Sequence, residues 1–89
     1  MRYDWKYTAK AVDDLKRLDR TVQQRILKKI SQFCSAKDPF AFAKPLSGPW
    51  KRLFRFRIGD YRAVFRKEAT GDLSILLILS IKHRREIYE

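Results

Sequence analysis

Residues 73–81 form an almost uninterrupted apolar run, broken only by Ser74 and Ser80. A short run that is apolar at consecutive positions is typical of a strand buried on both faces inside a sheet. It is well below the ~20 apolar residues that a membrane-spanning helix needs. We therefore expect a sheet in which this segment is the central strand, flanked by strands from earlier in the chain.

Two further segments alternate between apolar and polar residues, as half-buried strands do. Residues 2–7 place their three aromatic side chains on one face, and residues 53–58 alternate in the same way. A glycine-containing turn at residues 59–60 leads into a third run, residues 61–67. A second turn, at residues 70–72, then joins this run to the apolar segment. Both turns are short, which predicts antiparallel neighbours.

Two amphipathic helices are expected between the first strand and the second. The first follows Thr8, which can cap it, and its apolar stripe consists of Ala11, Leu15 and Leu18. The second begins near Asp19 or Thr21, because Thr21 and Gln24 form a capping-box pattern. Its apolar stripe consists of Val22, Ile26, Ile30, Phe33 and Cys34. Two such helices in series predict a helical hairpin lying on the sheet.

The expected fold class is α+β, with the element order β-α-α-β-β-β. A helical hairpin would pack on a mainly antiparallel four-stranded sheet. All three prolines lie between residues 35 and 50, so we expect a loop there. The chain has 89 residues, which suits one domain, so residues 1–89 are predicted to form a single unit.

The charge balance restricts the partners. Lys and Arg number 21 against 10 Asp and Glu, a formal net charge of +11, which favours nucleic acid, an anionic membrane surface or an acidic protein. One cysteine, Cys34, allows no internal disulfide and is expected to be buried and inert. The first residues show no signal-peptide pattern, so we expect a cytoplasmic protein with no membrane contact.

Common catalytic arrangements are missing from the sequence. One histidine and one cysteine exclude thiolate zinc sites, and the glycines form no phosphate-binding loop. Asp13 and Asp14 are expected to point to different helix faces and to be solvated. A two-metal nuclease needs several convergent carboxylates. We therefore expect no cofactor and no metal.

A basic and aromatic group of residues remains as the candidate site, consisting of Arg55, Arg57, Arg62, Lys82, His83, Arg84 and Tyr88. Such a group can cleave RNA, because RNA supplies its own nucleophile, the 2′-hydroxyl. Arginine matches phosphate oxygens and keeps its charge, while His83 and Tyr88 are the side chains able to move protons. Chemistry alone leaves catalysis, binding and solubility equally open.

Three stretches, PLSG at residues 45–48, LFRFRIGDYRAVF at 53–65 and HRREIY at 83–88, resemble the RelE/ParE superfamily of toxins from type II toxin–antitoxin systems. The similarity covers nearly the whole chain. For a RelE-like member it implies a metal-independent endoribonuclease that cuts mRNA in the ribosomal A site. By position, Arg55 and Arg57 resemble the two strand cations, Arg62 the transition-state arginine and Tyr88 the general base.

The resemblance leaves some assignments open. Either Lys82 or Arg84 matches the C-terminal cation, and His83 is an alternative to Tyr88 in proton transfer. The other branch of the superfamily, ParE, implies a poison of DNA gyrase with the same fold and no nuclease activity. The expected partners are an acidic antitoxin, the ribosomal A site and mRNA. The toxin is expected to be monomeric alone and part of a larger assembly with its antitoxin.

Overall fold

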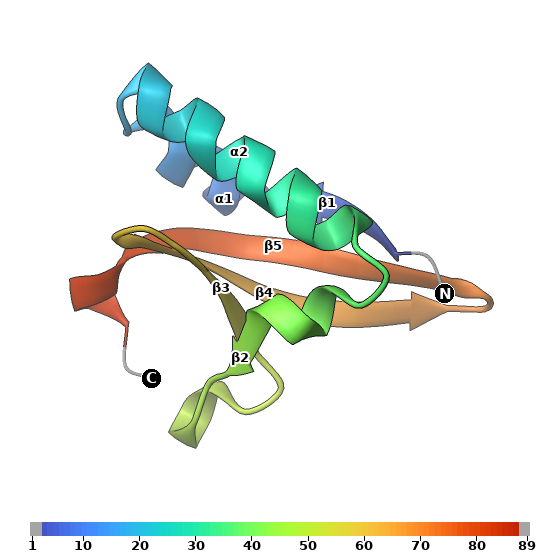
Figure 1. Cartoon of the computed structure of the whole chain (residues 1–89). Helices are drawn as coiled ribbons and strands as arrows, with labels where there is room; N and C mark the ends of the chain where they lie inside the picture. The colour runs from blue at the N-terminus through green and yellow to red at the C-terminus, as the bar shows by residue number, and fades with distance from the viewer. Residues whose placement is uncertain (1–2, 88–89) are drawn as a thin grey trace.

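A computed structural model describes residues 3–87 of the chain, as two helices packed over one side of a twisted sheet (Figure 1). The helices are α1 (Ala9–Lys16) and α2 (Arg20–Ser35). The strands are β1 (Tyr3–Tyr7), β2 (Ala43–Pro45), β3 (Phe54–Ile58), β4 (Tyr61–Thr70) and β5 (Leu73–His83). Three single 3₁₀ turns complete the order: η1 (Pro39–Phe42), η2 (Gly48–Trp50) and η3 (Arg84–Glu86).

The strands form one sheet in the order β1-β5-β4-β3-β2. β1 is parallel to β5, and the other pairs are antiparallel, which confirms the α+β class and the mainly antiparallel sheet. β5 lies between β1 and β4, so the apolar run is an interior strand, as expected. Its pairing with β4 is interrupted by a bulge, because Ser80 pairs with Val64 and Ile78 with Phe65.

The prediction of four strands was wrong, since the sheet of the described residues has five. The additional strand is β2, which pairs with β3 within the segment expected to be a loop. β2 is too short to show alternation, and Pro45 is tolerated in it because β2 is an edge strand, where a missing N–H donor is not needed by a neighbour.

The core lies between the helices and the helix-facing side of the sheet. Ile26, Ile30 and Cys34 of α2 are buried together with Ala11 and Leu15 of α1, as their stripes predicted. On the sheet they meet buried side chains that include Phe56, Phe65, Leu76 and Ile78. The rings of Phe56 and Phe65 stack with their centroids 4.3 Å apart. Close packing of this layer fixes which side chains of each strand face away from the helices.

The expected cap of the first helix is present, and that of the second is not. The Thr8 hydroxyl accepts a hydrogen bond from the Ala11 N–H at 3.1 Å. α2 begins at Arg20 after Asp19, with no side-chain hydrogen bond at the cap. Thr21 is therefore inside the first turn, where its hydroxyl is too far along the helix to cap it, and the Thr21–Gln24 capping box was a wrong prediction.

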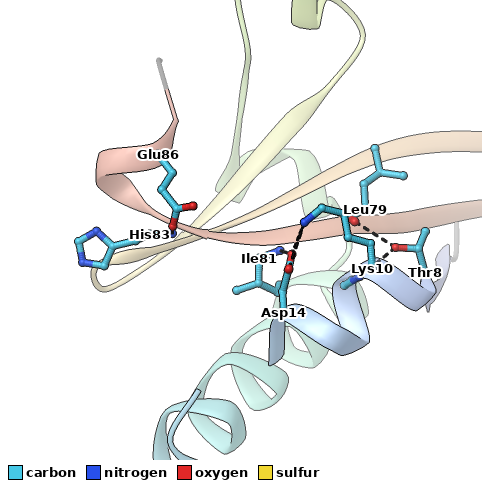
Figure 2. A network of polar contacts seen from close by, with 8 residues as sticks. Thr8, Lys10, Asp14, Leu79, Ile81, His83 and Glu86 are labelled. Atoms are coloured by element: carbon cyan, nitrogen blue, oxygen red, sulfur yellow. Dashed lines mark hydrogen bonds and ion pairs between the residues drawn. The ribbon is translucent and has the colours of Figure 1, made fainter. Parts of the chain in front are cut away.

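The expectation that Asp14 is solvated was also wrong. Its carboxylate accepts hydrogen bonds from the Ile81 N–H at 2.9 Å and from the Lys10 Nζ at 3.0 Å (Figure 2). The side chain is 16 % exposed. The sequence did not reveal this contact, because Asp14 and Ile81 are 67 residues apart and the bond depends on how α1 packs against β5.

Cys34 is buried as predicted, and burial raises the pKa of its thiol to about 12. In residues 3–87, no helix is long and apolar enough to cross a membrane.

Candidate functional site

Three cations of the predicted site form one row across the sheet. In the strand register, Arg57 of β3 lies opposite Arg62 of β4, and Arg62 lies opposite Lys82 of β5. Cross-strand partners project to the same face of a sheet, with Cβ atoms about 4.5–5.5 Å apart. We call Arg57, Arg62 and Lys82 the cation row.

The cation row faces away from the helices. The residues on either side of it along the strands, such as Phe56, Ile58 and Ala63, are buried in the core beneath the helices. Because successive side chains in a strand alternate, the row lies on the opposite face of the sheet. We call this face, which the helices do not cover, the open face. Arg55 lies two residues before Arg57 on β3 and shares that face, and Lys44 of β2 pairs with Arg55. The open face therefore carries cations from β2 to β5.

Arg62 is held in place by the turn between β3 and β4. Its Nη1 donates to the backbone oxygens of Gly59 at 2.9 Å and of Tyr61 at 3.0 Å. Gly59 has a φ of +59°, a left-handed conformation that glycine adopts without steric cost, and this turns its carbonyl back toward β4. Arg62 is 6 % exposed and Arg55 is 9 % exposed, while Arg57 is exposed. The row thus combines a rigid, buried guanidinium with an accessible one.

His83 occupies a different position from Lys82. It pairs with Tyr61, and the two rings meet edge to face with centroids 5.5 Å apart. Tyr61 packs against the core, so alternation places His83 at the helix-facing side of the sheet, near its end. Its Nδ1 accepts from the Arg85 N–H at 3.3 Å. The Glu86 carboxylate accepts from the His83 N–H at 3.0 Å (Figure 2). These bonds form a capping box for η3.

Lys82 and Arg84, the two candidates for the C-terminal cation, are also separated. Lys82 is in the row, whereas Arg84 begins η3 and is exposed. The Arg84 backbone N–H donates to the Asp60 backbone oxygen at 2.8 Å. The Arg84 Nε lies 3.7 Å from an Asp60 carboxylate oxygen. Arg84 therefore secures the C-terminal turn to the β3–β4 turn. Tyr88, the predicted general base, lies outside the described residues.

A pocket of about 330 Å³ lies beside the row on the open face. Lys82 lines it together with an apolar wall made of Leu46, Trp50, Leu53, Val64 and Leu79. Its walls come from the segment before β3, from β4 and β5, and from Lys10 of α1 and Glu86 and Ile87 near the C-terminus. This pocket was not predicted from the sequence. The alternation places Val64 on the open face, but no local pattern indicates that Trp50 covers it.

The described part of the chain offers no metal site. Within residues 3–87 no group of three or more His, Cys, Asp or Glu side chains is close enough together to bind a metal ion. The polar groups available at the row are guanidinium and ammonium donors, which suit phosphate oxygens and other anions.

Comparison with known proteins points to one superfamily. The family model described as ParE toxin of type II toxin-antitoxin system, parDE, matches residues 5–88. The toxin–antitoxin complex RelBE2 of Mycobacterium tuberculosis includes a chain 23 % identical, with a TM-score of 0.72, and the match covers 94 % of this chain and all of that one. The YoeB/ParE toxin of Agrobacterium tumefaciens is 23 % identical, with a TM-score of 0.70 and coverages of 90 % and 96 %.

A third solved structure, the RelB–RelE antitoxin–toxin complex of Methanococcus jannaschii, is 26 % identical over 93 % of this chain and 94 % of that one, with a TM-score of 0.61. Among curated proteins, none matches the chain significantly.

Proposed function

The chain belongs to the ParE toxin family of type II toxin–antitoxin systems, within the RelE/ParE superfamily, and from this premise we propose that it is a metal-independent endoribonuclease acting on mRNA in the ribosomal A site. The proposal rests on the cation row. Guanidinium and ammonium groups from three neighbouring strands lie together there, in the register that places Arg57, Arg62 and Lys82 opposite one another. Such donors match the oxygens of a phosphate group.

The reaction needs little from the protein beyond alignment and charge. The 2′-oxygen of the RNA bonds to the adjacent phosphorus, and the bond to the 5′-oxygen of the next nucleotide breaks. The products are a 2′,3′-cyclic phosphate and a 5′-hydroxyl. Negative charge grows on the phosphorane oxygens, which the planar donors of Arg62 and Arg57 and the ammonium of Lys82 would stabilise.

Two protons must also move, one from the 2′-hydroxyl and one to the leaving oxygen. Tyr88 and His83 remain our candidates. The His83 Nδ1 is occupied by the Arg85 N–H, so Nε2 is the ring nitrogen that could contact the RNA. Donation of a proton to the leaving oxygen would start from the imidazolium form, because a neutral imidazole is too weak an acid.

The second candidate function is poisoning of DNA gyrase, the activity of the ParE branch. The family model that matches this chain is the ParE model, which favours this alternative. In that case the open face would bind a protein, and the Arg62 hydrogen bonds to the turn would have a structural role alone.

We also propose a cognate acidic antitoxin as partner. Two of the similar structures are toxin–antitoxin complexes. The net charge of +11 favours a negatively charged partner that orders on binding.

One experiment separates the two candidates. The chain is induced in cells without its antitoxin, and mRNA 5′ ends and plasmid supercoiling are measured in the same culture. The nuclease predicts new mRNA ends inside codons, with supercoiling unchanged in the first minutes. Altered supercoiling or DNA breaks without new mRNA ends would identify the gyrase poison instead.

A further inference from the structure

The C-terminal part of β5, which carries Lys82, extends past the end of β1, its neighbour on the side away from β4. β1 ends at Tyr7, which pairs with Ile78. β5 continues from there to His83, so residues 79–83 have β4 as their strand neighbour but no partner in β1. Backbone groups on the side away from β4 need other partners if this part of the strand is to keep its position.

Helix α1 supplies those partners (Figure 2). The Thr8 N–H donates to the Ile78 oxygen at 3.0 Å, and the Thr8 hydroxyl donates to the Leu79 oxygen at 3.0 Å. Six residues later, on α1 itself, the Asp14 carboxylate accepts the Ile81 N–H at 2.9 Å. β1 therefore holds β5 by backbone pairing as far as Ile78. Beyond that point the side chains of Thr8 and Asp14 bond to the β5 backbone.

Asp14 contacts β5 close to the irregularity in the β4–β5 ladder. The bulge leaves Leu79 without a paired residue on β4, and pairing resumes at Ser80. Bulges disrupt the ladder locally and increase the twist. Ile81 is the residue after Ser80 and directly precedes Lys82. The Asp14 bond to Ile81 is made by an ionised acceptor, and such bonds are shorter and stronger than neutral ones.

We propose that Asp14 is a positioning residue, whose bond to the Ile81 N–H keeps Lys82 opposite Arg62 in the cation row. The inference rests on the proposed nuclease function. Asp14 itself lies on the helix side of the sheet and acts through the backbone of β5. The Lys10 ion pair, at 3.0 Å, orients the carboxylate from an exposed position and is secondary to the Ile81 bond.

The test compares Asp14→Ala with Asp14→Asn. The asparagine keeps an acceptor oxygen of the same reach, so it should retain the Ile81 bond, whereas alanine removes it. Asp14→Ala should slow single-turnover mRNA cleavage on ribosomes by roughly 10–100-fold with ribosome affinity unchanged, because misplacing a reacting group by about 1 Å has costs of that order. Asp14→Asn should restore the rate to within about threefold of wild type.

Two variants serve as controls. Asp13→Ala removes a neighbouring exposed carboxylate, and Lys16→Gln removes an exposed cation at the end of the same helix. Both should cleave at the wild-type rate. If Asp14→Ala cleaves as fast as these controls, or if Asp14→Asn is as slow as Asp14→Ala, the positioning role is overturned.

Amide hydrogen exchange gives a second readout that does not depend on cleavage. Asp14→Ala should accelerate exchange at Ile81 and Lys82 more than at core amides such as Phe56, whereas Asp13→Ala should not. Uniform acceleration would mean that Asp14 contributes only to global stability and would overturn the proposal. A wild-type protein that cuts no RNA would refute the proposed function, and the exchange pattern would still decide whether Asp14 anchors β5.

Discussion

The Arg62 side chain is fixed by the β3–β4 turn and is also the proposed transition-state arginine. Its Nη1 is bonded to two carbonyl oxygens of the β3–β4 turn, so the side chain is ordered before any ligand arrives. An ordered guanidinium loses less entropy when it binds a phosphate. The sequence predicted that Arg62 belongs to the site. It did not predict these bonds, because they depend on the left-handed Gly59 and on the short turn that follows it.

Replacement of Arg62 should affect activity and stability together. Arg62→Ala should lower the single-turnover cleavage rate by roughly 10²–10³, as loss of one preorganised donor does, and should also lower the melting temperature. Arg62→Lys keeps the charge but loses the planar donors, so it should fall between alanine and wild type. Cleavage assays with parallel thermal unfolding measure both effects. Wild-type cleavage by Arg62→Ala would exclude a catalytic role.

Replacement of Arg57 should slow cleavage but, unlike replacement of Arg62, should not lower the melting temperature. Arg57 is exposed and lies opposite Arg62, so Arg57→Gln removes a like-charge pair across the strands. We expect a slightly higher melting temperature and slower cleavage, a gain in stability at the expense of function. Arg20→Gln, an exposed arginine at the start of α2, is the matched control and should change neither. A lower melting temperature for Arg57→Gln would contradict the expected repulsion between Arg57 and Arg62.

Cys34 provides a pH test of the core. Burial raises the pKa of its thiol to about 12, so the folded state holds this proton where the unfolded state has lost it. Its contribution to stability is complete below the unfolded pKa, near 9, and is lost as the pH rises toward 12. Chemical denaturation from pH 8 to 11 should show the wild type losing stability faster than Cys34→Ala. Parallel curves would mean that the thiolate is not excluded from the fold.

At the scale of elements, α1 connects the two layers. Thr8 caps α1 through the Ala11 N–H and also donates to Leu79 of β5. The alternation within residues 3–7 and 53–58 predicted β1 and β3 correctly, and the spacing of apolar residues predicted both helices. The short strand β2, the bulge and the Asp14–Ile81 bond could not be predicted, because each depends on contacts between segments distant in sequence.

Thr8→Ala should destabilise the fold by about 1–2 kcal/mol, because it removes the cap and leaves the Leu79 oxygen without its hydroxyl donor. Thr8→Ser keeps the hydroxyl and should lose less than half of that. Urea denaturation of the three proteins measures the difference. Equal stability of Thr8→Ala and wild type would show that α1 does not depend on this cap.

For the whole molecule, the main feature is the separation of the two sides of the sheet. The helices cover one side, and the other side carries Lys44, Arg55 and the cation row. The net charge of +11 follows directly from the composition, and the strand register brings three of the predicted site residues, Arg57, Arg62 and Lys82, side by side. The sequence could not show that His83 lies apart from the row, because that depends on the register at the end of β5.

RNA binding should depend on where a charge lies and not only on the total charge. Lys44→Gln with Arg57→Gln should weaken binding of a short single-stranded RNA and reduce the slope of log K against log salt by about 1.4, or 0.7 for each phosphate contact. Lys16→Gln with Arg20→Gln removes the same charge from the helix side and should leave the slope nearly unchanged. Fluorescence anisotropy from 50 to 300 mM salt measures both. Equal slopes for the two double variants would exclude the open face as the binding surface.

The chemistry of the cut RNA ends tests the central claim most directly. Purified translating ribosomes are incubated with the protein, and the mRNA fragments are analysed for their terminal groups. Attack by the 2′-hydroxyl predicts a 2′,3′-cyclic phosphate and a 5′-hydroxyl at a cut within the A-site codon. Fragments with a 5′-phosphate would imply attack by water and contradict the mechanism, and intact mRNA would contradict the nuclease function itself.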